Sequence, residues 1–157
     1  MLNKIPKILS PELVKTLMEM GHGDTIVIAD GNFPSETYGK KVIRADGHGV
    51  PELLDAILEL CPLDVKYSET PVGLMEVVQG DTIVPTIWDE YKYILDEHYS
   101  QRPNIDYIER FRFYNYAKEA YAIIATGEKA VYANILLTKG IVGWNVKCKI
   151  KNVKLMW

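Results

Sequence analysis

The chain of 157 residues has only two cysteines, Cys61 and Cys148, and no long hydrophobic run. The cysteines lie far apart and form no Cys-x-x-Cys pair, so neither a disulfide framework nor a zinc knuckle is indicated. No apolar run reaches the roughly 18 residues of a membrane span, and the first residues lack the apolar segment and cleavage site of a secretory signal. We therefore expect a cytoplasmic protein with no membrane partner.

An excess of basic charge is also missing, because the formal net charge is −3. Without a basic field the chain is a poor partner for a phosphate backbone, so nucleic-acid binding is disfavoured. There is no G-x-G-x-x-G, G-x-x-x-x-G-K-[ST], H-E-x-x-H or G-x-S-x-G motif, and we expect no cofactor. His22, Asp24, Asp30 and His48 are possible metal ligands by type, but their spacing does not predict a metal site.

Hydrophobic residues make up 48% of the chain and charged residues 25%, the balance of an ordinary globular protein. The length suits a single domain over residues 1–157. Capping residues and apolar positions at helical spacing predict helices, whereas short apolar runs rich in β-branched residues predict strands. The expected helices cover 11–20, 51–61, 87–98 and 113–121, and the expected strands cover 24–30, 42–46, 72–78, 105–108, 122–125 and 132–137, with a loop over 31–40.

Because these strands and helices alternate, the sequence predicts an α/β protein, a three-layer α/β/α sandwich with a mixed, largely parallel sheet. The C-terminal segment 141–157 differs from the rest. Apolar and polar residues alternate strictly from Trp144 to Lys151, which predicts an extra strand with one buried face. Its lysines are typical of a solvated strand edge.

Of the three histidines, His22 is in the setting that best suits catalysis. It lies in Gly21-His-Gly-Asp24, just after a predicted helix, where the helix dipole and Asp24 both favour a protonated imidazole. A protonated imidazole can act as a general acid. The alternative is a capping histidine that donates to the free carbonyls of the helix end. His48 and His98 are expected to be structural.

Polar residues at strand ends are candidates for ligand binding. Asp30 follows a buried strand, and ligands of open α/β sheets lie outside the carboxyl ends of strands; alternatively, Asp30 forms a turn with Asn32. Arg110 follows the strand 105–108, although a surface ion pair is its commoner use. In an extended segment Tyr132 and Asn134 would share one face, where a phenol and an amide suit sugar hydroxyls.

Several motifs occur together in one order along residues 1–140. They are Gly21-His-Gly-Asp24, Asp30 with Phe33-Pro34, Val42-Ile-Arg-Ala-Asp-Gly47, Arg110-Phe-Arg-Phe-Tyr114, Thr126-Gly-Glu128 and Tyr132-Ala-Asn-Ile-Leu-Leu137. This series resembles the RbsD/FucU family of L-fucose mutarotases and D-ribose pyranases. The first, third and fourth motifs are more similar to the fucose branch, and the ribose branch is the alternative.

The resemblance implies an isomerase that interconverts the α and β anomers of a pyranose without cofactor or metal, as a ring-shaped homodecamer. His22 matches the proton donor of the family. Asp30, Arg110, Tyr132, Ala133 and Asn134 match its sugar-contacting positions, and Asp30, or a water that it orients, is the candidate base. The family pattern ends soon after Gly140, so the C-terminal segment is a departure that bears on assembly rather than on chemistry.

The positions of His22 and Asp30 raise a geometric difficulty. One precedes the first predicted strand and the other follows it, so they could lie on the order of 20 Å apart in one subunit. Either the turn folds back, or one site takes the two residues from different subunits, which we favour. A non-catalytic sugar-binding module is the competing class of function, and a metal-dependent sugar isomerase is a third.

Overall fold

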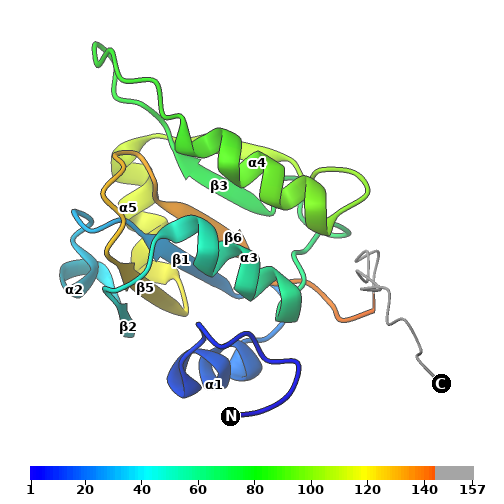
Figure 1. Ribbon diagram of the computed structural model, residues 1–157. Coiled ribbons are helices and arrows are strands. Elements are labelled where there is room, and N and C mark those ends of the chain that lie inside the picture. The colour runs from blue at the N-terminus through cyan, green and yellow to red at the C-terminus, as the bar shows by residue number, and fades with distance from the viewer. Residues whose placement is uncertain (144–157) are drawn as a thin grey trace.

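The computed structural model describes residues 1–143, in which helices and strands alternate (Figure 1). The helices are α1 (Pro11–Glu19), α2 (Ser35–Tyr38), α3 (Val50–Leu60), α4 (Ile87–His98) and α5 (Arg110–Glu119). The strands are β1 (Thr25–Ala29), β2 (Val42–Ala45), β3 (Val72–Met75), β4 (Ile105–Ile108), β5 (Ala122–Thr126) and β6 (Ile135–Thr138).

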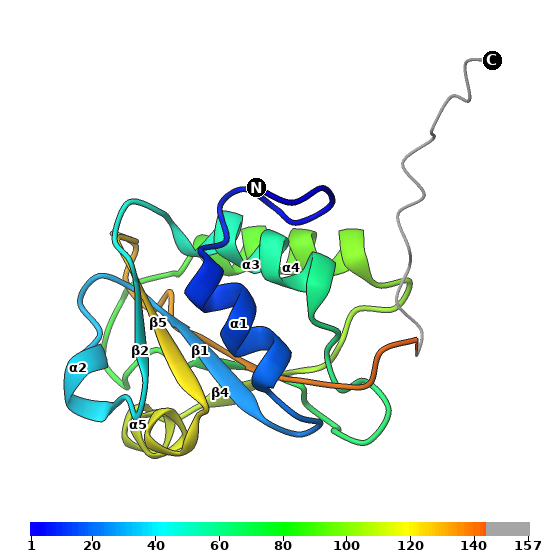
Figure 2. The ribbon, with the colours of Figure 1, turned by 90° about the horizontal axis from the view of Figure 1, so that it is seen from below.

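The strands form one sheet in the order β2-β5-β1-β6-β3-β4. Among the strands of residues 1–143, only β6 pairs antiparallel with its neighbours β1 and β3, and the other pairings are parallel. Five strands therefore point the same way. Helices α3 and α4 lie on one side of the sheet and α5 lies on the other (Figure 2). The expected α/β/α sandwich with a mixed, largely parallel sheet is confirmed.

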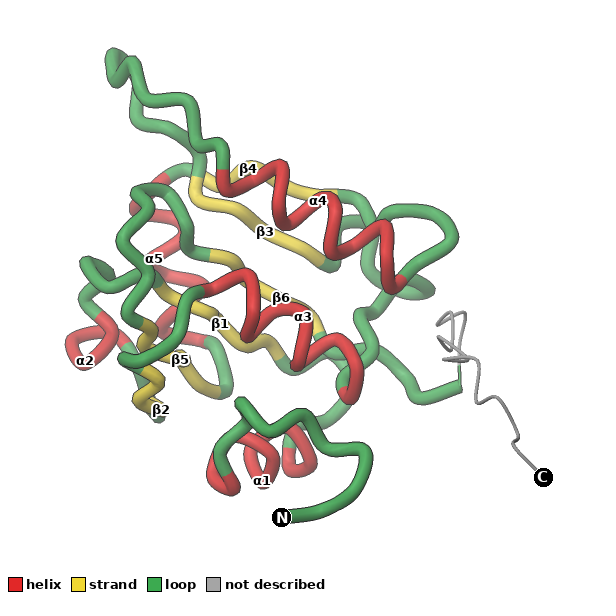
Figure 3. The backbone as a smooth tube through the Cα atoms, in the orientation of Figure 1, coloured by secondary structure: helices red, strands yellow, loops and turns green. Residues whose placement is uncertain are grey.

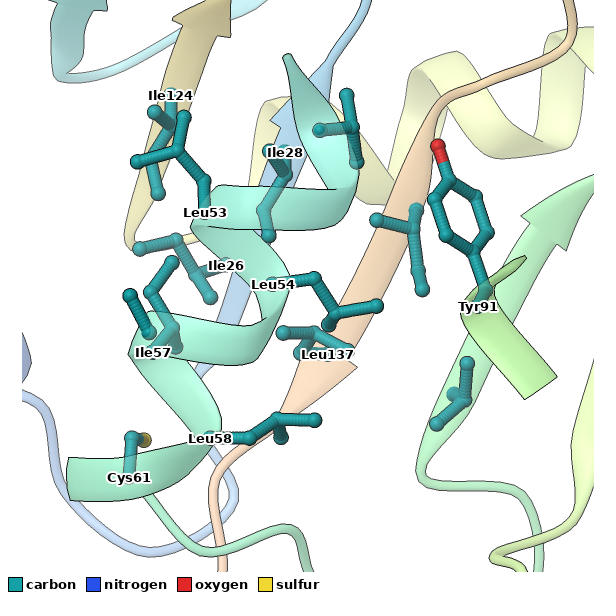
Figure 4. Packing of buried hydrophobic residues seen from close by; sticks show 14 of the residues in the cluster. Ile26, Ile28, Leu53, Leu54, Ile57, Leu58, Cys61, Tyr91, Ile124 and Leu137 are labelled. Carbon is teal, nitrogen blue, oxygen red and sulfur yellow. The ribbon is translucent and has the colours of Figure 1, made fainter. Parts of the chain in front are cut away.

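The larger core lies between the sheet and helices α1, α3 and α4. Apolar residues of α3 at helical spacing, among them Leu53, Leu54 and Ile57, pack onto Ile26 and Ile124 of the sheet (Figure 4). These side chains are at most 1% exposed. A smaller core on the other face joins α5 to the same strands. Strands β1 and β5 therefore bury both faces, which explains their continuous apolar sequences.

Several predicted boundaries are wrong. The expected loop 31–40 contains the short helix α2, and β3 ends at Met75 rather than at residue 78. Helix α5 begins at Arg110 rather than at residue 113, because Glu109 caps it by accepting hydrogen bonds from Phe111 N and Arg112 N. Strand β6 begins at Ile135, not at residue 132.

The remaining sequence predictions concern the C-terminal segment, the cysteines and the absence of a membrane span. The extra strand expected over residues 144–151 and Cys148 lie outside the described residues. Cys61 is a buried free thiol, as expected. Within residues 1–143, no helix has the length and hydropathy to span a membrane. A cytoplasmic location stays a prediction from the sequence.

Candidate functional site

One edge of the sheet collects most of the predicted site residues. Because β1 and β4 are parallel, Asp30 and Arg110 follow their strands at the same edge. Strand β6 runs the opposite way, so Asn134, which precedes it, lies at this edge too. Asp30 N donates to Asn134 Oδ1 at 2.8 Å, which joins the ends of β1 and β6 directly. This edge is where open α/β sheets bind small ligands.

The carboxyl group of Asp30 is buried beneath this edge, with the residue 6% exposed. Asp30 Oδ1 accepts a hydrogen bond from Asn32 N at 2.9 Å, so the turn expected from the sequence is present as well. Burial raises the pKa of Asp30 above its ordinary value, while hydrogen bonds from Asn32, Ala133 and Phe33 backbone amides and from the Asn134 side chain oppose the shift. Desolvation is the larger effect.

Residues 131–132 form a turn and residues 133–134 have no regular structure, so this segment is not the strand that the sequence predicts. Tyr132 has a φ of 56°, in the left-handed region that a side chain with a Cβ rarely adopts. Helix α4 holds this backbone at two points. Trp88 Nε1 donates to Tyr132 O at 2.8 Å, and Tyr91 Oη donates to Ala133 O at 2.6 Å. The hydroxyl of Tyr91 points at the chain that leads into β6 (Figure 4).

The side chain of Tyr132 contacts the loop that joins β3 to α4. This loop projects away from the rest of the molecule (Figure 3). Tyr132 Oη donates to Asp81 Oδ2 at 2.6 Å and accepts from Val78 N at 3.3 Å. The hydrogen bond lowers the pKa of Asp81 and raises the pKa of Tyr132. The phenol therefore stays a neutral donor over the physiological pH range.

Arg110 stands at the first position of α5, beside a group of aromatic rings. Arg110 Nε donates to Tyr114 Oη at 3.0 Å, and the guanidinium lies 5.6 Å from the centroid of that ring. Tyr114 stacks on Tyr38 at 4.8 Å and packs against Phe33 at 5.6 Å. The charge of Arg110 acts to lower the pKa of Tyr132, against the larger upward effect of the hydrogen bond to Asp81. The site thus combines a cation, hydroxyls and apolar rings.

His22 lies at the opposite edge of the sheet. It precedes β1, whose five residues separate it from Asp30 by about 16 Å of strand. His22 Nε2 lies 3.0 Å from Asp64 Oδ2, and its ring packs at 5.3 Å from that of Tyr67. The sequence placed Asp24 beside the imidazole, but Asp24 Oδ2 instead accepts from Gly21 N at 2.7 Å. The turn does not fold back to bring His22 to Asp30.

The alternative role for His22, as a cap of α1, is wrong. Lys139 Nζ occupies the carbonyls at that helix end, donating to Leu17 O at 2.7 Å and to Met20 O. A cation there also interacts favourably with the helix dipole. His98, expected to be structural, is 5% exposed and pairs with Asp55 at 2.6 Å.

Sequence reasoning missed Glu128 as well as Asp64, Trp88 and Tyr91. Glu128 Oε2 accepts from Val50 N at the start of α3, and its carbonyl accepts from Gly31 N at 2.8 Å, next to Asp30. Each missed residue acts on a partner more than 40 residues away, which no local pattern signals. Among residues 1–143, no group of three or more His, Cys, Asp or Glu is placed to hold a metal ion.

The fold and this edge together define an α/β protein in which polar side chains, a cation and aromatic rings gather at the carboxyl ends of parallel strands. Residues 3–142 match the RbsD / FucU transport protein family. The chain is 45% identical to the L-fucose mutarotase of Actinobacillus pleuropneumoniae over 141 residues, which cover 90% of this chain and 97% of that protein. It is 47% identical to the fucose mutarotase of Homo sapiens over 150 residues, which cover 92% and 96%.

A solved structure of a further mutarotase is also similar to this chain. The fucose mutarotase of Streptococcus pneumoniae, in complex with L-fucose, superposes with a TM-score of 0.86 and 52% sequence identity. The match covers 90% of this chain and 99% of that chain. The chain belongs to the RbsD/FucU family.

Proposed function

We propose that this protein is an isomerase that interconverts the α and β anomers of L-fucose. The observation that carries the proposal is the likeness to mutarotases over nine-tenths of the chain, together with a solved relative that holds L-fucose. The edge that bears Asp30, Arg110, Tyr132, Ala133 and Asn134 offers the donors, acceptors and rings that a monosaccharide needs.

The reaction opens and recloses the sugar ring. A proton is delivered to the ring oxygen while another leaves the anomeric hydroxyl, and the bond between the ring oxygen and the anomeric carbon breaks. The open aldehyde rotates about its first carbon–carbon bond and recloses on the other face. Each proton can be returned in the closing step, so no other reactant is consumed. General acid and base groups typically contribute about 10²- to 10⁴-fold each.

His22 is the proposed proton donor, and Asp30, or a water that it orients, is the proposed base. The raised pKa of Asp30 suits this role, because a base works best when its pKa approaches the working pH. Arg110, Tyr132 and Asn134 bind and orient the hydroxyls, with the backbone of Ala133 beside them. The rings of Phe33 and Tyr114 form an apolar surface for the methyl group of fucose.

The site requires two subunits. His22 and Asp30 of one chain lie at opposite edges of the sheet, and no monosaccharide spans the distance between them. We infer that His22 of one subunit meets Asp30 of the next, which explains why a simple mutarotase would assemble. The family resemblance suggests a ring of ten subunits, in which each contact completes one site.

Exchange spectroscopy by NMR tests this function directly. We expect cross-peaks between the α and β anomeric signals of L-fucose to grow faster with the wild-type protein than in buffer. They should fall to the buffer rate with His22→Ala, while the affinity for fucose changes little. Faster exchange of D-ribose than of fucose would favour the pyranase branch.

The competing classes give different results in the same experiment. A sugar-binding module would bind fucose without accelerating exchange, so wild type and His22→Ala would be alike. A metal-dependent isomerase would lose activity when a chelator is added, whereas the proposed enzyme would not. Exchange of neither sugar above the rate in buffer would contradict the proposed function.

A further inference from the structure

We propose that Asp64 is a positioning residue that binds the Nε2 side of His22 and leaves Nδ1 as the nitrogen that exchanges a proton with the sugar. The inference rests on the proposed function in one respect, that His22 is the proton donor. No sequence motif points to Asp64, which lies 42 residues from its partner.

The side chains of His22 and Asp64 are in close contact, and the aspartate is much more buried than the imidazole. Asp64 Oδ2 lies 3.0 Å from His22 Nε2, with the aspartate side chain 7% exposed and the imidazole 44% exposed. The other oxygen, Oδ1, accepts a hydrogen bond from Tyr67 N at 3.1 Å. An ionised carboxylate only accepts hydrogen bonds, so Nε2 carries a proton that it donates to Oδ2.

The same strand end holds both partners in place. On the His22 side, Gly23 N donates to Lys139 O, and Lys139 N donates to Asp24 O, both at 2.8 Å. On the other side, Asp64 N donates to Thr138 O at 3.0 Å, and Gly140 N donates to Pro62 O at 2.7 Å.

Glycine is required at position 140 because any Cβ there would collide with the carbonyl of Leu63. The loop that carries Asp64 therefore lies directly on the end of β6. Both loops are fixed to residues 138–140, so the distance between imidazole and carboxylate is set by the sheet. The ring of Tyr67 packs against the imidazole at 5.3 Å and further limits its rotation.

This arrangement assigns different tasks to the two ring nitrogens. The bond that one nitrogen makes determines the state of the other. With Nε2–H donated to Asp64, the proton that His22 delivers to the sugar as the proposed acid is carried by Nδ1, which takes a proton back as the ring recloses. Proton transfer to the sugar therefore takes place at Nδ1.

The substitution Asp64→Asn should reverse this assignment without changing the volume of the side chain. Tyr67 N needs an acceptor, so the amide oxygen of the new asparagine must face it. The NH₂ group then faces Nε2 and donates to it, which moves the proton of neutral His22 to Nδ1. The imidazolium would meet an N–H donor instead of a carboxylate and would be disfavoured.

The test combines tautomer and rate measurements on the full chain. ¹⁵N chemical shifts of labelled histidine, recorded at alkaline pH where imidazoles are neutral, should show protonated Nε2 in wild type and protonated Nδ1 in Asp64→Asn. For L-fucose, kcat should fall by about 10- to 100-fold, a smaller loss than the 10² to 10⁴ typical of removing a general acid. KM should change little.

Asp55→Asn is a matched control, because it alters the other part-buried His–Asp contact of residues 1–143, to His98 at 2.6 Å. It should change the ¹⁵N signals of His98 and leave kcat unchanged. A wild-type His22 protonated on Nδ1, or full kcat in Asp64→Asn, would overturn the proposal. If wild type exchanges neither sugar, the proposed function fails, yet the tautomer of His22 still supports or overturns the role of Asp64.

Discussion

At the scale of single residues, the proposed base is a buried carboxyl group. Asp30 is removed from water beneath the sheet edge, and the resulting desolvation outweighs the backbone amides that stabilise its charge. Nearby, Asp46 follows β2 at the same edge but is exposed and paired with Arg44, which lowers its pKa. Two aspartates at the same edge therefore respond to pH in opposite directions.

We predict opposite pH dependences for Asp30→Asn and Asp46→Asn. Because the folded state raises the pKa of Asp30, wild type loses stability relative to Asp30→Asn as pH rises from below 3.8 through the folded pKa. Because the folded state lowers the pKa of Asp46, the stability from its bond to Arg44 is present above 3.8 and lost as pH falls through the folded pKa.

Denaturant unfolding of the three proteins at pH 3 and pH 7, at equal protomer concentration, measures both effects. The stability of Asp30→Asn relative to wild type should be higher at pH 7 than at pH 3. The relative stability of Asp46→Asn should be lower at pH 7. The same sign for both variants would contradict the environment assigned to Asp30.

At the scale of elements, helix α4 holds residues 132–134 in a conformation that they would not adopt alone. Tyr132 takes up a left-handed backbone conformation at a cost of order 1–3 kcal/mol for such residues. Trp88 and Tyr91 donate hydrogen bonds to the carbonyls of Tyr132 and Ala133. The helix therefore serves both as a core element and as the support of Tyr132 and Asn134.

We predict that Tyr91→Phe destabilises the fold by about 1–3 kcal/mol, because the buried carbonyl of Ala133 loses its donor. The KM for L-fucose should rise as well, since the turn that carries Tyr132 and Asn134 is less firmly held. Tyr93→Phe is the matched control, being the same change on the same helix at a side chain that is 67% exposed. Equal stability and KM in both variants would show that the Tyr91 hydroxyl does not support the segment.

At the scale of the whole molecule, the proposed acid His22 and the proposed base Asp30 lie at opposite edges of the sheet. Strand β1 lies between His22 and Asp30, so in the proposed assembly each subunit supplies half of a site at either edge. If a neighbour completes each site, activity is a property of the proposed assembly. This is the reason to expect that complementary inactive subunits restore activity when mixed.

We predict that mixing His22→Ala with Asp30→Ala under conditions of subunit exchange restores part of the mutarotase activity. Some contacts in the mixed assembly join the intact Asp30 of one variant to the intact His22 of the other. The control is His22→Ala mixed with the double variant His22→Ala/Asp30→Ala, in which no His22 exists. Exchange between labelled subunits is followed in parallel by native mass spectrometry. No recovery despite proven exchange would refute a site shared between subunits.

The sequence by itself determined the elements whose cause is local. The apolar runs of β1 and β5 and the helical spacing of Leu53, Leu54 and Ile57 specify their own structure, because burial on one or two faces requires those patterns. The sequence also determined that Asp30 and Arg110 lie at one edge of the sheet, because each residue follows a strand that its apolar pattern predicts.

Only the tertiary structure decided what depends on distant partners. The sequence predicts a strand from residue 132, yet two donors on α4 hold the carbonyls of Tyr132 and Ala133, and β6 begins only at Ile135. Asp24 lies two positions from His22, yet the carboxylate that contacts the imidazole comes from Asp64, because the end of β6 brings the two loops together. Local sequence patterns report local conformational preferences and burial, whereas these contacts depend on how the sheet orders its strands.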